Sequence, residues 1–420
     1  MAAGRVKLKS FRLKGYRSCK ATELTFEPTV TVLIGPNGSG KTNLMHGLRL
    51  LSGNRRRILR GGPERDQYAL RSQIYGDFSV GKKGLRLKVE ITFRPGSNGA
   101  DIPLSAKETW DLTEFGIKEP WVKIQHVGTL RIGGAVLLDY GQKYNSKLSI
   151  VHQRRGKAST VSTLEQDAAD AVAAVNKFRS NIDYYSASQF TNPSACPTSF
   201  EVDEDGDLAD PVLARRNTQL RFVHDLYRIS VDDEDAYNNY LNLVGVDGIR
   251  LVEEINWQET TFSSTSYEVR SGGKIINKKR ERILIIPVVT VSGQQLSFDQ
   301  LSEGTFRTLA ILFHLMTDTG SLLLLEEPEV CVHYGLLASV IEVIKDRSAR
   351  KQIVISTHSE ALLDSMVPEQ IRLVKRGERS GTKAIALSRS MSAKRFGALK
   401  DYLRSEGNLG EYWRHSGFGQ

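Results

Sequence analysis

One glycine-rich segment combines residue types and a spacing that suit phosphate binding. Residues 35–42 read GPNGSGKT and lie between a β-branched apolar run at 29–34 and an apolar-striped segment that begins at Lys41. Glycines let the backbone curl so that several N–H groups point at a phosphate, and the following helix N-terminus adds partial positive charge. We expect Lys41 to reach the β- and γ-phosphates of a nucleotide and Thr42 to offer its hydroxyl to Mg²⁺. The predicted nucleotide-binding residues are Gly35, Pro36, Asn37, Gly38, Ser39, Gly40, Lys41 and Thr42.

Two adjacent carboxylates follow a run of leucines. The four leucines at 322–325 predict a buried strand, and Glu326 and Glu327 emerge at its C-terminal end, where open α/β sheets bind ligands. Neighbouring carboxylates at such an edge are poorly tolerated without a cation. We therefore interpret Glu326 as a ligand of Mg²⁺ through its water and Glu327 as the base that orients an attacking water. Taken alone, the same residues could form an exposed acidic turn.

Two shorter motifs are ambiguous when each is taken alone. Ser302 and the backbone N–H of Gly304 precede a helical run and could hold an anion at its N-terminus, although the same residues make an ordinary helix cap. His358 ends an apolar run that begins at residue 353. We interpret it as a sensor of a γ-phosphate, the alternative being a histidine that is satisfied at the surface or in the core.

The elements that must position these motifs alternate between strands and helices at both ends of the chain. This alternation predicts an α/β fold with a mainly parallel sheet. The patterns predict strands at 6–17, 29–34, 84–94, 283–291, 322–325 and 352–356, and helices from 41 and at 162–180, 211–227, 304–317 and 334–345. Pro287 indicates an edge or a break in the strand at 283–291. We expect an N-terminal lobe at 1–95 and a C-terminal lobe at 283–420, split by an inserted, partly helical middle region at 96–282 that provides partner or dimer contacts.

Composition places the chain among ordinary globular proteins. Its apolar share is 40% and its charged share 25%, and it contains no apolar stretch long enough to span a membrane. The three cysteines are far apart, which suits a reducing, cytoplasmic setting. The net charge of +10 is clustered near 55–60, 82–88 and 278–282. Such clusters suit contact with DNA or RNA, although solvated loop charges are the alternative.

Together, and in this order, the forms GPNGSGKTNL, LSEGT, LEEPE and STHS resemble the ATP-binding-cassette class of P-loop ATPases. More narrowly they are similar to its RecF, SMC and OLD branch, as is the turn at 16–18 and the DYYSA segment at 183–187. The resemblance implies ATP and Mg²⁺ as ligands, ATP hydrolysis by Glu327 and His358, and a head with an antiparallel β lobe. It also implies head-to-head dimers, in which Ser302 and Gly304 of one protomer close on ATP held by Lys41 of the other.

Three positions depart from the pattern of that branch or match it weakly. Glu326 stands where many relatives carry aspartate, and its extra methylene bears on the geometry of the Mg²⁺ site. Gln73 is the only candidate for the glutamine that contacts Mg²⁺ after the first lobe. His333 falls in the loop that faces the dimer partner, next to Tyr334 where proline is usual.

The resemblance extends to ATPase subunits of bacterial anti-phage defence systems of the Septu, PARIS and retron-associated kinds. It implies a homodimer or higher homo-oligomer that controls a separately encoded nuclease or toxin, because the stretch after Arg376 is too short for the nuclease domain that OLD proteins carry. The alternative is a stand-alone RecF-like repair ATPase that binds DNA in an ATP-dependent way. A transporter subunit is disfavoured, because LSEGT differs from the transporter form LSGGQ.

Overall fold

The computed structural model describes residues 6–52, 68–81, 83–95, 101–114, 122–128, 149–153, 161–210, 217–270, 274–317, 320–330, 332, 334–405 and 407–416. The chain forms two compact units. Unit 1 comprises Met1–Tyr184, Thr319–Glu327 and Ser348–Gln420, and unit 2 comprises Tyr185–Asp318 and Pro328–Arg347. The segment boundaries expected at 95 and 282 stay a prediction. No helix within the described residues is long and apolar enough to cross a membrane.

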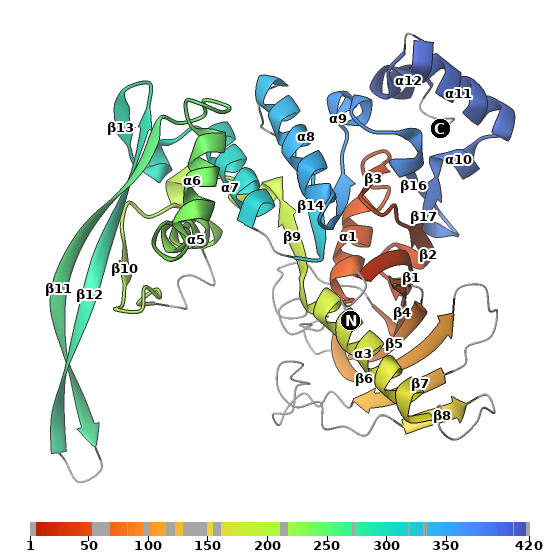
Figure 1. Ribbon diagram of the computed structural model, residues 1–420, viewed down its shortest axis with the longest axis horizontal. Helices are drawn as coiled ribbons and strands as arrows, with labels where there is room; N and C mark the ends of the chain where they lie inside the picture. Colours follow the sequence, from red (N-terminus) through yellow and green to blue (C-terminus); the bar gives the residue numbers. More distant parts are fainter. Residues whose placement is uncertain are drawn as a thin grey trace. The chain divides into compact units, whose positions relative to one another are not determined.

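The phosphate loop and the paired carboxylates lie at the ends of strands of a six-stranded sheet (Figure 1). Its order is β17-β16-β3-β15-β14-β9, and β16, β3, β15 and β14 run parallel. The strands are β3 (Val30–Ile34), β9 (Ile182–Ser186), β14 (Leu322–Glu326), β15 (Gln352–Ser356), β16 (Ile371–Gly377) and β17 (Gly381–Ala386). Every residue of β3, β14 and β15 is buried, which explains their uninterrupted apolar runs. The mainly parallel sheet is thus confirmed.

A second sheet of unit 1 has the order β2-β1-β4-β5-β6-β7-β8, and each neighbouring pair of its strands is antiparallel. Its strands are β1 (Val6–Tyr16), β2 (Cys19–Thr25), β4 (Tyr68–Val80), β5 (Lys83–Pro95), β6 (Asp101–Glu114), β7 (Val122–Gly128) and β8 (Ser149–Gln153). The strand expected at 84–94 is therefore β5. The first strand ends one residue earlier than expected, because Arg17 takes a left-handed φ of 46° in the turn to β2. The antiparallel lobe confirms the predicted fold class.

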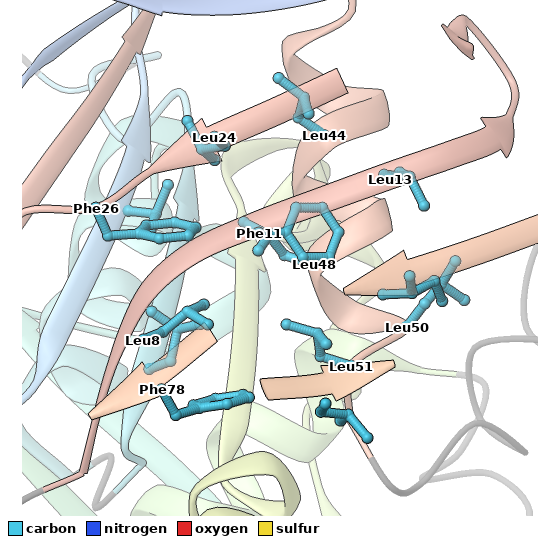
Figure 2. Close-up of a cluster of buried hydrophobic side chains, with 14 of the residues drawn as sticks. Leu8, Phe11, Leu13, Leu24, Phe26, Leu44, Leu48, Leu50, Leu51 and Phe78 are labelled. Carbon is cyan, nitrogen blue, oxygen red and sulfur yellow. The ribbon is translucent and has the colours of Figure 1, made fainter. Parts of the chain in front are cut away.

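The core of unit 1 lies between this lobe and helix α1 (Lys41–Arg49). Figure 2 shows Phe11 and Leu13 of β1 beside Leu44 and Leu48 of α1. The helix approaches the strand closely, since a Cβ on Gly47 would lie 2.4 Å from Leu13 Cδ2. The other helices of unit 1 are α3 (Val161–Ser180), α9 (Glu360–Asp364), η5 (Pro368–Gln370), α10 (Leu387–Ser390), α11 (Ala393–Ser405) and α12 (Leu409–Ser416).

Unit 2 combines a small antiparallel sheet with helices (Figure 1). Its strands are β10 (Phe200–Val202), β11 (Glu254–Arg270), β12 (Lys274–Val291) and β13 (Gln294–Leu296). Its helices are η2 (Ala187–Phe190), η3 (Pro193–Ala195), α5 (Thr218–Asp232), α6 (Glu234–Val244), η4 (Phe298–Gln300), α7 (Glu303–Thr317) and α8 (Tyr334–Ser348, whose last residue belongs to unit 1). The helix expected at 211–227 begins later, and residues 211–216 lie outside the described residues.

Pro287 does not break β12. It pairs with Trp257 of β11 and lies between residues 283–285, which pair with β10, and residues 289–291, which pair with β13. The strand is therefore an edge at this point on the side away from β11, where a missing N–H costs no ladder hydrogen bond. The edge alternative for Pro287 describes the structure, and the break does not.

Candidate active site

The phosphate loop at 35–42 joins β3 to α1 and is shaped by its glycines. Gly38 and Gly40 have φ of 75° and 105°, which only glycine adopts readily. A Cβ on Gly35 would lie 2.1 Å from the Val374 carbonyl oxygen, and one on Gly40 would lie 2.2 Å from Thr382 Oγ1. The loop is thus pressed against β16 and β17. Gly40 is the N-cap of α1 and offers no side chain to its first turn, which leaves backbone N–H groups for an anion.

Lys41 is buried at the start of α1, and only 7% of it is exposed. Its Nζ donates to the carbonyl oxygens of Gly35, at 2.8 Å, and Pro36, at 3.3 Å, and lies 2.7 Å from His358 Nε2. An ammonium group only donates hydrogen bonds, so Nε2 of His358 is the acceptor and Nδ1 carries the proton. The lysine predicted to hold phosphate and the histidine predicted to sense it therefore meet.

His358 follows β15, where its imidazole faces one positive and one negative group. Burial lowers its pKa below the ordinary value of 6.5, the charge of Lys41 lowers that pKa further, and Glu327 acts in the opposite sense. His358 Nε2 lies 3.9 Å from Glu327 Oε1. The side chain is consequently neutral near pH 7 and able to exchange hydrogen bonds with a charged ligand.

Glu326 and Glu327 occupy different environments although they are adjacent. Glu326 is 9% exposed and accepts from Thr42 Oγ1 at 2.5 Å. Glu327 has a φ of 48°, and its N–H donates to the Ser356 carbonyl oxygen at 2.9 Å. The left-handed backbone turns the side chain of Glu327, 41% of which is exposed, toward His358. Such a conformation is costly for a residue with a Cβ and is concentrated at functional sites.

The residues present fit a magnesium–nucleotide ligand. A carboxylate and a threonine hydroxyl are the oxygen ligands that Mg²⁺ prefers, and Thr42 and Glu326 place them together. Ser39 Oγ, inside the phosphate loop, is buried without a hydrogen-bond partner in the described part of the chain. A phosphate oxygen would satisfy that hydroxyl, because buried polar groups ordinarily have a partner.

Ser302 and Gly304 lie in unit 2, at the start of α7. Ser302 Oγ accepts from the Thr305 N–H at 3.1 Å, and the Ser302 residue is exposed. The structure therefore realises the helix cap that the sequence left open as an alternative. The residues of the phosphate loop, Glu326, Glu327 and His358 all belong to unit 1.

The remaining positions named from sequence lie elsewhere or are not described. Gln73 is in β4, where its Nε2 donates to Glu90 Oε1 at 2.8 Å and its Oε1 accepts from the Tyr75 hydroxyl at 3.0 Å. Both bonds join side chains within the antiparallel lobe. His333 lies outside the described residues.

Tyr184 is a site residue that the motifs did not reveal. Its hydroxyl donates to Glu326 Oε2. Tyr184 belongs to β9, which is the edge strand of the sheet and the neighbour of β14. The sequence signal was the DYYSA segment, whose alternation places one of its two tyrosines on each face of the strand.

Two family models together match residues 7 to 364. The model described as an AAA ATPase domain matches residues 7–193, and an AAA domain model whose description names the AbiEii toxin and a type IV TA system matches residues 183–364. The chain carries AAA ATPase domains. The residues that meet around Lys41 and Glu326 lie within the two matched ranges.

The AAA domains are similar in sequence to parts of two kinds of curated proteins. The chromosome partition protein Smc of Mycobacterium tuberculosis is 48% identical over 61 residues, which are 14% of this chain and 5% of that protein. The DNA replication and repair protein RecF of Desulfitobacterium hafniense is 36% identical over 89 residues, which are 20% of this chain and 23% of that protein. This chain therefore spans less than a quarter of the length of either relative.

Among solved structures, the SMC head domain from Thermotoga maritima has a TM-score of 0.42 at 12% identity. The match covers 90% of this chain and 98% of that one.

Proposed function

We propose that this chain is an ABC-type ATPase that binds ATP with Mg²⁺ at residues 35–42 and hydrolyses it. The observation that carries the proposal is the meeting of Lys41, His358 and Glu327 beside the Thr42–Glu326 pair. The AAA ATPase domains supply independent support, since they cover the same motifs. Phosphoryl transfer to water requires three groups close together: a phosphate-binding lysine, a metal-binding carboxylate and a second, more exposed carboxylate.

Each residue has a distinct part in this proposal. Lys41 and the N–H groups of the loop bind the phosphates, and Thr42 and Glu326 hold Mg²⁺. Bound Mg²⁺ would neutralise charge that develops on the transferred phosphoryl group. Glu327 is the base because its carboxylate is more exposed than that of Glu326 and can accept a hydrogen bond from water. His358, neutral with a proton on Nδ1, positions the terminal phosphate.

The hydrolytic site is completed by a second copy of the chain in this proposal. Ser302 and Gly304 begin a helix whose N-terminus is exposed, and Ser302 already presents its Oγ there. A helix N-terminus favours anions, and the γ-phosphate of ATP bound to a partner protomer is such an anion. ATP would then join two heads, and hydrolysis would release them.

We further propose that the dimer controls a separately encoded effector, a nuclease or a toxin, in anti-phage defence within the cytoplasm. The support is the family model over residues 183–364, whose description names a toxin of a toxin–antitoxin system. The RecF similarity favours a second candidate, an ATPase that itself binds DNA when ATP is present.

Nucleotide binding tests the first part of the proposal. Lys41→Ala should abolish binding of a fluorescent ATP analogue, because the substitution removes the ammonium group that we propose binds the phosphates. Lys9→Ala is the matched control, since Lys9 is an exposed lysine of the same unit. Retained ATP affinity in Lys41→Ala would overturn the proposed site.

A plating assay separates the two candidate roles. Co-expression of this chain with the product of its neighbouring gene should lower phage plating, and Lys41→Ala should restore plating. Unchanged plating would contradict the defence role. If the purified chain alone retards DNA only with ATP, the RecF-like role is supported instead.

A further inference from the structure

Tyr184 contacts the carboxylate assigned to the metal on the side opposite to Thr42. Thr42 Oγ1 donates to Glu326 Oε1 at 2.5 Å, while the Tyr184 hydroxyl donates to Glu326 Oε2. The two oxygens of one buried carboxylate are thus each held by a hydroxyl. Hydrogen bonds to an ionised acceptor are stronger than those between neutral groups.

Arg17 fixes the direction of the hydrogen bonds that link it to Tyr184 through His46, because its guanidinium can only donate. Arg17 Nη1 lies 3.3 Å from His46 Nδ1, and a guanidinium donates and never accepts. Nδ1 of neutral His46 is therefore the acceptor, and its Nε2 carries the proton. Nε2 lies 3.3 Å from the Tyr184 hydroxyl oxygen, so it donates there. The Tyr184 hydroxyl therefore donates its own proton to Glu326. Along this series of hydrogen bonds from Arg17 to Glu326, each bond polarises the next donor.

The ring of Tyr184 is held by the helix that begins in the phosphate loop. His46 packs edge-on against it with ring centroids 5.4 Å apart, and the Arg49 guanidinium lies 4.6 Å from its centroid. Both residues belong to α1. The position of the hydroxyl is consequently tied to the element that positions Lys41 and Thr42.

We propose that Tyr184 is a positioning residue that fixes Glu326 for Mg²⁺ binding. The proposal rests on the proposed function, because it assigns Glu326 to the metal. The glutamate side chain has several rotatable bonds, so its carboxylate needs a restraint to stay in one orientation. The Tyr184 bond to Oε2 supplies that restraint and leaves Oε1 on the Thr42 side.

The test is the Mg²⁺ dependence of ATP binding in Tyr184→Phe, which removes one hydroxyl and keeps the ring. ATP affinity is first measured in EDTA and then during titration with Mg²⁺. We expect unchanged affinity in EDTA and an apparent Mg²⁺ affinity about 10-fold weaker than in the native protein, the usual scale for losing a partner of a metal ligand. Tyr185→Phe is the matched control, since the ring of Tyr185 stacks on His314 at 4.0 Å in unit 2.

The outcomes separate this inference from the proposed function. If the native protein fails to bind ATP in either condition, the proposed function fails. If it binds ATP and Tyr184→Phe has a native Mg²⁺ titration, the positioning role is overturned while the ATP site stands. An equal loss in Tyr185→Phe would also overturn it, because the effect would then come from β9 as a whole.

A double variant tests whether the hydroxyl acts through Glu326. Glu326→Asp shortens the side chain by one methylene and withdraws the carboxylate from Tyr184. In that background, Tyr184→Phe should change the Mg²⁺ affinity by less than about 2-fold, because the bond is already lost. A second fall of about 10-fold in the double variant would show that Tyr184 acts elsewhere, against the proposal.

Discussion

Lys41 Nζ lies 2.7 Å from His358 Nε2, so the lysine of the phosphate loop donates to the histidine that follows the neighbouring parallel strand β15. The two residues are 317 positions apart in sequence. Their contact joins the first and the last motif of the site, and it fixes the tautomer of His358 with the proton on Nδ1.

The pKa of His358 should respond to Lys41. Burial and the Lys41 charge hold this pKa below 6.5, so Lys41→Met should raise it by removing the second of these causes. Because the folded-state pKa lies below the ordinary value, His358 contributes stability above pH 6.5 that is lost as the pH falls through the folded-state pKa. NMR titration of the imidazole, assigned with His358→Gln, measures the shift. An unchanged pKa in Lys41→Met would contradict the contact.

Glu327→Gln should slow ATP turnover by about 100-fold or more while ATP still binds. The amide keeps the size of the side chain but cannot accept a proton from water. Steady-state phosphate release and equilibrium ATP binding are measured side by side. Glu342→Gln is the control, because Glu342 is an exposed carboxylate on α8. Native turnover in Glu327→Gln would remove this residue from the role of base.

The motif strands and helices were accessible from sequence because their signals are local. The leucines at 322–325 form β14, and the helices expected at 304–317 and 334–345 are α7 and α8 within a few residues. Burial on both faces of a parallel strand leaves an unbroken apolar run, and that run locates Glu326 and Glu327 at its end.

The chain of side chains from Arg17 to Glu326 was not accessible in the same way. Arg17 lies in a turn, His46 on a helix and Tyr184 on a strand, and their contacts depend on tertiary packing that no short motif encodes. The role of Gln73 stays a prediction: its residue type alone nominated it, and its hydrogen bonds lie within the antiparallel lobe.

His314 should make unit 2 sensitive to acid. Its ring stacks on Tyr185 at 4.0 Å, and burial lowers its pKa from 6.5 to about 3. The neutral form is therefore favoured by folding, and stability is present above pH 6.5 and falls as the pH drops toward 3. Complete protonation costs about 5 kcal/mol. Urea unfolding of His314→Phe should show a weaker loss of stability between neutral and acid pH. A native pH dependence would refute this assignment.

Gly410 should be required for docking α12 on α9. Its N–H donates to Asp364 Oδ1 at 2.5 Å, and a Cβ there would lie 2.6 Å from the Glu360 carbonyl oxygen. Gly410→Ala should therefore lower the free energy of unfolding by about 1–3 kcal/mol. Gly397→Ala on α11 is the control, because a Cβ there meets no atom within 4 Å and should be neutral or stabilising. Equal melting temperatures for Gly410→Ala and the native protein would contradict the close packing.

A mixture of two inactive variants tests the shared site most directly. Lys41→Ala keeps Ser302 but loses the phosphate lysine, whereas Ser302→Arg keeps Lys41 but blocks the helix N-terminus. Each variant alone should hydrolyse no ATP, and Ser302→Arg should still bind it. In an equal mixture, half of the dimers pair the variants and hold one intact site of two, so about a quarter of native turnover should return. A mixture as inactive as its components, or an active Ser302→Arg monomer, would contradict a site built from two protomers.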